Sequence, residues 1–122
     1  MHPESTVPSP RQLQRARRSE YAVRQARHAA AIRRLSRRED NIEYLNSIKL
    51  ARGCVDCGYR AHAVALDFDH LPGFEKRKGV ALLCHRGAKR AVLDAELAKC
   101  EIVCANCHRV RTQRRKLEQA GR

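Results

Sequence analysis

Two cysteine pairs of equal spacing are the clearest indication of a chemical site in this sequence. Cys54 and Cys57 are separated by two residues, and so are Cys104 and Cys107. Two thiolates at this spacing can bind one metal ion from a single tight turn, and four complete the tetrahedral sulfur site typical of structural zinc. Gly58, which follows the first pair, permits such a turn. We therefore predict that the four cysteines hold one structural Zn²⁺.

A second group of residues has the chemistry of phosphodiester hydrolysis. Asp69 offers a hard oxygen ligand suited to Mg²⁺ or Mn²⁺. His70 beside it carries an imidazole suited to be a general base. His108 directly follows the second cysteine pair, so zinc binding would hold its imidazole rigidly. We expect Asp69 and His108 to bind a catalytic cation and His70 to activate water.

A basic helix is predicted after the second cysteine pair, from Ala105 to about Gln119. Arg111 and Arg115 follow His108 by three and seven residues, which places all three side chains on one helical face. We expect the two arginines to meet the phosphates that flank a scissile bond. The other candidate DNA contacts on this helix are Arg109, Arg114 and Lys116.

The composition favours a nucleic-acid partner. The chain has 26 Lys+Arg against 13 Asp+Glu, a formal net charge of +13 over 122 residues. Nucleic acid is the commonest partner of proteins with so large a basic excess. Aromatic residues make up only 4% and Trp is absent, so we do not expect a large core. A small domain of this kind needs a metal or disulfides for stability.

The cysteines are predicted to bind metal and not to form disulfides. Residues 1–10 are rich in Pro and Ser and lack the apolar region of a signal peptide. No apolar run reaches the length of a membrane span, so we expect no membrane partner. A reducing cytoplasm fits this sequence, and paired cysteines there are typically zinc ligands; three disulfides are the alternative. Cys84 and Cys100 are expected to be small buried hydrophobic residues, although Cys100 with Cys104 is another possible ligand pair.

The chain begins with a leader and an arm. Residues 1–10 show no periodicity and are predicted to be disordered. Residues 11–52 lack Gly and Pro and are rich in Arg and Ala, which predicts one long helix or two helices with a break near residues 36–41. The arginines of this basic arm can neutralise phosphates; alternatively the arm is a solvated helix or a tail ordered only when bound. Its last part, residues 42–50, is more apolar and is expected to pack on the domain that follows.

A compact α+β domain is predicted at residues 53–119, after the helix ends at Gly53. Apolar and polar residues alternate over residues 64–69, which predicts a strand. Residues 74–79 are expected to form a charged loop, and residues 80–83 a second strand or the start of a helix. Three elements complete the expected domain: a helix over residues 88–99, a short strand at residues 102–103, and the basic helix, with residues 120–122 as a tail.

These motifs resemble the HNH endonucleases, the ββα-metal nucleases, and are most similar to small phage and bacterial versions with a four-cysteine zinc site. The resemblance covers about residues 54–112 and rests on the two cysteine pairs, on Asp69-His70 followed by a Pro-Gly pair, and on His108. It implies a zinc-stabilised, treble-clef-like ββα-metal finger in a bacterial or phage-infected cell. It also implies that Asp69 and His108 bind the catalytic cation, that His70 activates water, and that double-stranded DNA is cut to leave a 5′-phosphate and a 3′-hydroxyl.

One position departs from the pattern of this family. The family's middle Asn, about nine residues before the final His, pins the loop that bears the general base. Lys99 stands there in this chain. Either backbone groups or Glu101 pin the loop, or the activity is weakened. The alternative function is therefore a non-catalytic zinc-finger protein that binds nucleic acid through its basic helices.

Overall fold

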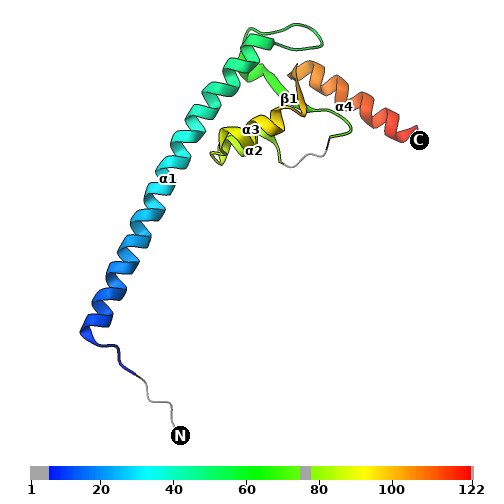
Figure 1. Cartoon of the computed structure of the whole chain (residues 1–122). Helices are drawn as coiled ribbons and strands as arrows, with labels where there is room; N and C mark the ends of the chain where they lie inside the picture. The colour runs from blue at the N-terminus through cyan, green and yellow to red at the C-terminus, as the bar shows by residue number, and fades with distance from the viewer. Residues whose placement is uncertain (1–5, 75–77, 122) are drawn as a thin grey trace. The chain divides into compact units, whose positions relative to one another are not determined.

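The computed structural model describes residues 6–74 and 78–121. Half of the predicted leader (residues 1–5), the centre of the predicted charged loop (residues 75–77) and the last residue of the predicted tail lie outside the described residues. Over the described ranges the chain has four α-helices, one short 3₁₀ helix and a two-stranded antiparallel sheet (Figure 1). The predicted α+β class is therefore confirmed. The chain divides into two compact units, Met1–Arg33 and Arg34–Arg122.

Helix α1 (Pro10–Arg52) is continuous over 43 residues, so of the two predicted alternatives the single long helix is the one found. It begins with reciprocal capping bonds. The Ser9 N–H donates to Gln12 Oε1 at 2.7 Å, and the Gln12 N–H donates to Ser9 Oγ at 3.3 Å. The helix ends at Gly53, whose φ of 70° is the left-handed conformation expected after a helix.

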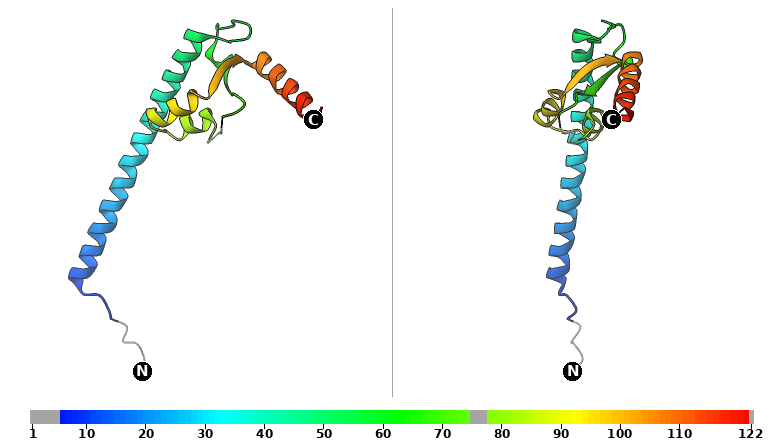
Figure 2. Two further views of the ribbon diagram at one scale, coloured as in Figure 1. Left: turned by 45° about the vertical axis from the view of Figure 1, so that its right-hand side comes forward. Right: turned by 90° about the vertical axis from the view of Figure 1, so that its right-hand side faces the viewer.

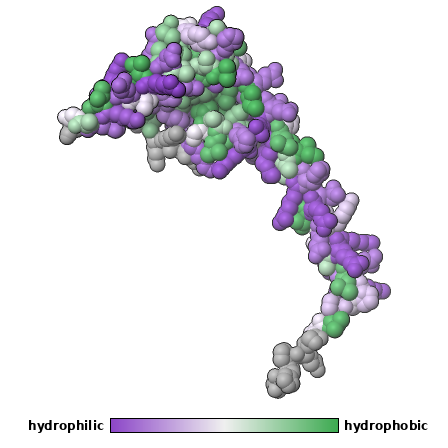
Figure 3. Space-filling view, turned by 180° about the vertical axis from the view of Figure 1, so that it is seen from behind, coloured by the Kyte–Doolittle hydropathy of each residue, from purple (hydrophilic) through white to green (hydrophobic). Residues whose placement is uncertain are grey.

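The part of α1 up to Arg33 forms a unit of its own. Its side chains are almost all exposed, and hydrophilic ones cover most of this arm in the view of Figure 3, interrupted by separate hydrophobic ones. No apolar face runs along it, since its hydrophobic residues are scattered around the helix. Helix-forming Arg and Ala residues, and not packing, therefore hold this segment helical.

From Arg34 onward α1 belongs to the compact domain. Side chains of this part contact α2 (Val80–His85) and α3 (Arg90–Leu97). Leu45, the buried apolar residue of α1, lies in the first core cluster, whose other buried members are Val80, Leu83, Cys84 and Leu93. The compact unit thus begins inside the helix, at Arg34. The packing expected of residues 42–50 on the following domain is found at Tyr44 and Leu45. Residues 80–83, left open between strand and helix, are helical.

The turn between α2 and α3 is held by side chains of α1. Arg37 Nε donates to the Gly87 carbonyl and Asn41 Nδ2 donates to the Ala88 carbonyl, both at 2.8 Å. Gly87 has φ 67°, and a Cβ on it would lie 2.4 Å from the carbonyl oxygen of Arg34. Glycine is therefore required here both for the backbone conformation and for the close approach of α1.

The sheet joins β1 (Leu66–His70) to β2 (Cys100–Cys104), the two arrows of Figure 2. Leu66 lies opposite Cys104 and His70 lies opposite Cys100. Helix α4 (Ala105–Ala120) follows β2 without a loop, as predicted. Strand β1 starts two residues later than the alternation predicted, because Ala63–Ala65 form a 3₁₀ turn. The second core cluster lies against this sheet, and its buried members are Cys54, Leu66, Ile102, Val103 and Cys104.

Replacing Gly87 with Ala should destabilise the domain by about 2 kcal/mol or more, since the new methyl group meets the backbone of α1 in a strained conformation. Denaturant unfolding at saturating zinc measures the effect. Gly79→Ala is the matched control, because Gly79 has an ordinary φ and open space around it. Equal stability of the two variants would contradict the proposed contact between the α2–α3 turn and α1.

Candidate functional site

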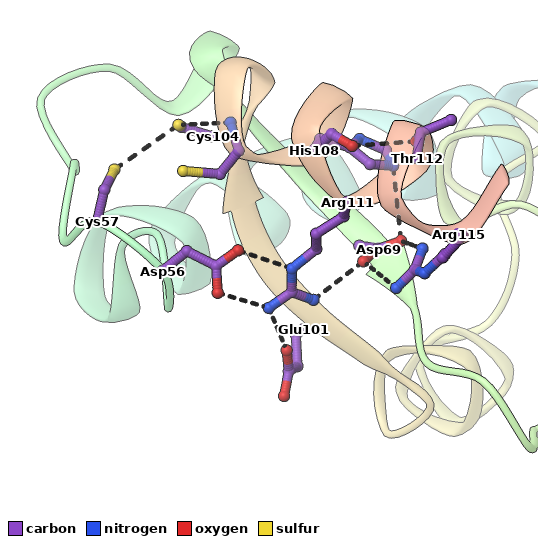
Figure 4. Close-up of polar contacts among 10 residues, drawn as sticks. Asp56, Cys57, Asp69, Glu101, Cys104, His108, Arg111, Thr112 and Arg115 are labelled. Carbon is purple, nitrogen blue, oxygen red and sulfur yellow. Dashed lines mark hydrogen bonds and ion pairs between the residues drawn. The ribbon is translucent and has the colours of Figure 1, made fainter. Parts of the chain in front are cut away.

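The four predicted zinc ligands come together. Cys54 and Cys57 lie on the turn after α1, while Cys104 ends β2 and Cys107 lies in the first turn of α4. Their sulfur atoms all lie within 4.8 Å of one another. The Cys107 N–H donates to Cys104 Sγ at 3.4 Å, so the sulfur that begins α4 also caps it (Figure 4).

The geometry of the cluster fits a metal better than a disulfide. Cys57 Sγ and Cys104 Sγ are 3.7 Å apart, whereas a disulfide requires about 2.05 Å. Zinc–sulfur bonds of about 2.3 Å in a tetrahedron place neighbouring sulfurs about 3.8 Å apart. The four cysteines can therefore hold a metal such as zinc.

The electrostatics of the four thiols lead to the same conclusion. Burial opposes ionisation of Cys54, but hydrogen bonds from backbone groups of Cys104, Cys57 and Asp56 outweigh it and lower the pKa of that thiol to about 6. Sulfur contact with Cys104 and burial raise the pKa of Cys107 to about 12. Four sulfurs this close cannot all carry negative charge unless a cation neutralises them.

The remaining two cysteines are apart from this cluster. Cys84 is 6% exposed and belongs to the first core cluster, as predicted. Cys100 is half-buried, and its Sγ donates to the Glu96 carbonyl at 3.3 Å. Cys100 is not among the grouped sulfurs, so the alternative ligand pair with Cys104 is not the arrangement found.

A second cluster is built around Asp69, whose carboxylate is 4% exposed. Arg115 binds both of its oxygens in a two-pronged contact of 2.8 Å each, and Arg111 donates to Oδ2 at 3.0 Å (Figure 4). Burial alone would raise the pKa of Asp69, but hydrogen bonds from the two guanidinium groups lower it overall. Asp69 is therefore a buried carboxylate held in its charged form.

His108 faces the same carboxylate. Its Nε2 lies 3.6 Å from Asp69 Oδ1, and its Nδ1 lies 3.0 Å from Asp67 Oδ2. When Nδ1 carries the proton and donates it to Asp67, the Nε2 lone pair points toward Asp69. A carboxylate behind a histidine is the usual way that proteins orient an imidazole for metal binding.

Asp69 retains acceptor capacity on the side of His108. A carboxylate offers about four lone-pair positions, and the arginines take two on Oδ2 and one on Oδ1. The remaining position belongs to Oδ1, which is the oxygen nearest His108 Nε2. One oxygen and one nitrogen are thus left to share a cation.

Arg111 is the centre of a network of carboxylates. Its guanidinium binds both oxygens of Asp56 at 2.7 Å, Glu101 at 2.8 Å and Asp69 at 3.0 Å. Hydrogen bonds from this guanidinium are the main reason why the pKa of Asp56 is lowered. Arg111 therefore links the cysteine turn, both strands and α4. Both Arg111 and Arg115, predicted to contact phosphates, hold carboxylates in this structure.

His70 lies on the opposite face of β1 from Asp69, as adjacent residues of a strand must. Its Nε2 is 3.0 Å from Oε2 of Glu96, a carboxylate on α3 that is only 4% exposed, and Lys99 Nζ lies 2.7 Å from the other oxygen. The Leu71 N–H donates to the Lys99 carbonyl at 2.9 Å. Backbone groups thus pin the loop after His70, and Glu101 does not, because it binds Arg111.

Three predicted DNA contacts remain exposed on α4: Arg109, Arg114 and Lys116. The spacing of two residues places Asp67 on the same face of the strand as Asp69, and the sequence favoured a solvated side chain over one that supports the site; the structure places it against His108. Glu96 gives no sequence signal, since it lies 26 residues from His70 and its burial depends on how α3 packs.

Comparison with family models, curated proteins and solved structures finds no match to this chain. The assignment of the site therefore depends on its geometry alone. Each helix in the described ranges is too short or too polar to cross a lipid bilayer.

Replacing Cys57 with Ser should release zinc and unfold the domain, because zinc binding supplies folding free energy on the order of 10 kcal/mol. Metal analysis and thermal unfolding measure both effects, and chelator treatment of the unaltered chain should reproduce them. Cys84→Ala, in the core but outside the cluster, should keep one zinc per chain. Unchanged zinc content and melting in the Cys57 variant would refute the assignment.

Proposed function

We propose that this chain is a metal-dependent DNA endonuclease of the HNH type, stabilised by a structural zinc. The observation that carries the proposal is the 3.6 Å pairing of Asp69 Oδ1 with His108 Nε2. This pair lies where β1 meets α4, directly after the cysteine cluster. The chain order of an antiparallel strand pair followed by a helix is the order expected for a ββα-metal finger, and supports the proposal.

Asp69 and His108 are the residues that would hold Mg²⁺ or Mn²⁺. Neighbouring ligands of an octahedral cation with bonds of about 2.1 Å lie about 3 Å apart, which is near the observed spacing. A bound divalent cation supplies neutralisation of the charge that develops on the phosphate. Arg115 and Arg111 hold Asp69 charged, and Asp67 keeps the His108 lone pair directed at it.

His70 would be the general base. Glu96 receives the hydrogen bond of His70 Nε2–H, which leaves Nδ1 as the atom that can accept a proton from water. The attacking hydroxide would form a new P–O bond while the bond to the 3′ oxygen breaks, and that oxygen would take up a proton from solvent water, which gives 5′-phosphate and 3′-hydroxyl ends. Glu96 is a positioning residue in this scheme, and Lys99, at the place of the family's Asn, holds Glu96 through an ion pair at 2.7 Å.

His70→Ala should reduce cleavage of supercoiled plasmid by roughly 10²- to 10⁴-fold, the usual contribution of a general base. Glu96→Gln should lower kcat by about tenfold or more with little change in KM, since it disturbs the base and not DNA binding. Exposed Glu43→Gln is the control and should cut like the unaltered chain. Cleavage by His70→Ala at the normal rate would exclude His70 as the base.

A non-catalytic zinc-finger protein that binds nucleic acid is the second candidate. The observation that favours it is that Arg111 and Arg115 already neutralise Asp69, as in a purely structural ion-pair network. The same plasmid assay separates the two candidates. Cleavage that requires added Mg²⁺ or Mn²⁺ supports the nuclease, whereas DNA binding without cleavage at any metal concentration supports the binding protein.

Both candidates bind DNA through exposed basic residues, on α4 and on the arm. If these contact about six phosphates, the logarithm of the binding constant should fall with the logarithm of salt concentration with a slope of roughly −5. Removing residues 1–33, which form a separate unit, should make the slope less negative and leave the domain folded. An identical slope with and without the arm would exclude the arm from binding.

A further inference from the structure

A cleft of about 600 Å³ lies between α1, β1 and α2, all within the compact domain. His70 and His108 both line it, so it reaches the proposed catalytic residues from the side of α2. Much of its wall is apolar, formed by Ile42, Leu45, Phe68, Val80, Ala81 and Cys84. A volume of this size is typical of sites that bind a small molecule or part of a larger one.

Cationic side chains line the same cleft. Lys49 is half-buried, with its Nζ 5.2 Å from the centroid of the Phe68 ring. Burial lowers the pKa of Lys49, against the opposing attraction of Asp67. Within residues 6–74 and 78–121, no hydrogen-bond acceptor or ion-pair partner contacts this ammonium. Arg38 also lines the cleft, so two cationic groups are available to an anion that enters.

The apolar wall and the two cationic side chains together indicate which class of ligand fits the cleft. A purely apolar ligand would bring no negative charge to Lys49 and Arg38 and would shield them further from water, which costs free energy. A simple inorganic anion would make no use of the apolar wall. A nucleotide satisfies both requirements, because its phosphate is anionic and its base and sugar bury apolar surface.

We propose that this cleft binds one unstacked nucleotide of the substrate strand, next to the phosphate that is cut. Its base lies against the apolar wall near Ile42 and Ala81, and its phosphate lies at Lys49 and Arg38. A base that remains stacked in a duplex cannot enter a cleft, so the nucleotide is flipped out or belongs to a single-stranded stretch. The identity of the polymer rests on the proposed function, whereas the nucleotide site rests on the cleft itself.

The test uses the full zinc-loaded chain without added Mg²⁺ or Mn²⁺, so that binding is measured apart from cleavage. Thymidine 5′-monophosphate is titrated while backbone amide NMR shifts are recorded. We expect saturable shifts at Ile42 and Ala81, and an affinity weakened by about fivefold or more in both Ala81→Trp, which fills the cleft, and Lys49→Gln.

Two variants of the same helices serve as matched controls. Leu82→Trp places the same bulky group on α2, and Arg52→Gln removes a cation from the end of α1; neither residue lines the cleft. Both should bind the nucleotide like the unaltered chain. Inorganic phosphate and thymidine are titrated separately, and each should give weaker shifts than the nucleotide.

Three results would overturn the proposal: no saturable shift in the unaltered chain, full affinity in Ala81→Trp, or equal shifts with inorganic phosphate alone, which would mean only an anion site. Plasmid cleavage by the same proteins is scored independently. Nucleotide binding in the cleft without any cleavage would support this site while rejecting the nuclease, so the two failures are distinguishable.

Discussion

The grouping of four sulfur atoms is the constraint on which the rest of the domain depends. It joins the turn that follows α1 to the point where β2 becomes α4, two places about 50 residues apart in the chain. The core around it is small, since among the residues that the structure describes only Leu66, Leu93 and Val103 are large and fully buried. A metal held at this junction would supply the folding free energy that so little apolar surface cannot, and would fix where α4 starts. Every side chain that α4 presents to the sheet follows from that starting point.

Charged side chains organise the contact between the sheet and α4. Asp69 is buried as a charged group, which is tolerated because guanidinium groups from α4 surround it. Arg111 connects it to carboxylates from two further segments. The result resembles a core made of ion pairs in place of apolar side chains. The same network keeps Asp69 in its charged form, which is the form that the proposed cation site would require.

Local patterns in the sequence were enough to place the elements and the cysteines. The capping residue Gly53, the two cysteine pairs and α4 depend on neighbours within a few residues, and they are found as predicted. The strand at residues 64–69 shows where local pattern fails. Val64 fits the alternation, but it lies in a 3₁₀ turn and is 91% exposed, because no partner strand reaches it.

Contacts between distant segments could not be read from the sequence. Glu96 meets His70, and Asp67 meets His108, only because α3 and α4 pack on particular faces of the sheet. Arg111 and Arg115 were placed on the correct helical face, yet their partners are carboxylates that come from other elements. The apolar character of residues 42–50 was enough to expect their packing on the domain, but nothing in the sequence indicated that Arg37 and Asn41 would hold the turn between α2 and α3.

The uninterrupted passage from β2 into α4 limits how related sequences can vary in length. Each added residue turns a helix by about 100°, so one insertion between Cys107 and Arg115 would rotate the arginine away from Asp69 while leaving the sulfurs grouped. Insertions at residues 61–62 carry no such penalty, because these exposed residues supply no member of the site. Natural variants should therefore differ in loop length before β1 and keep the spacing from Cys104 to Arg115 unchanged.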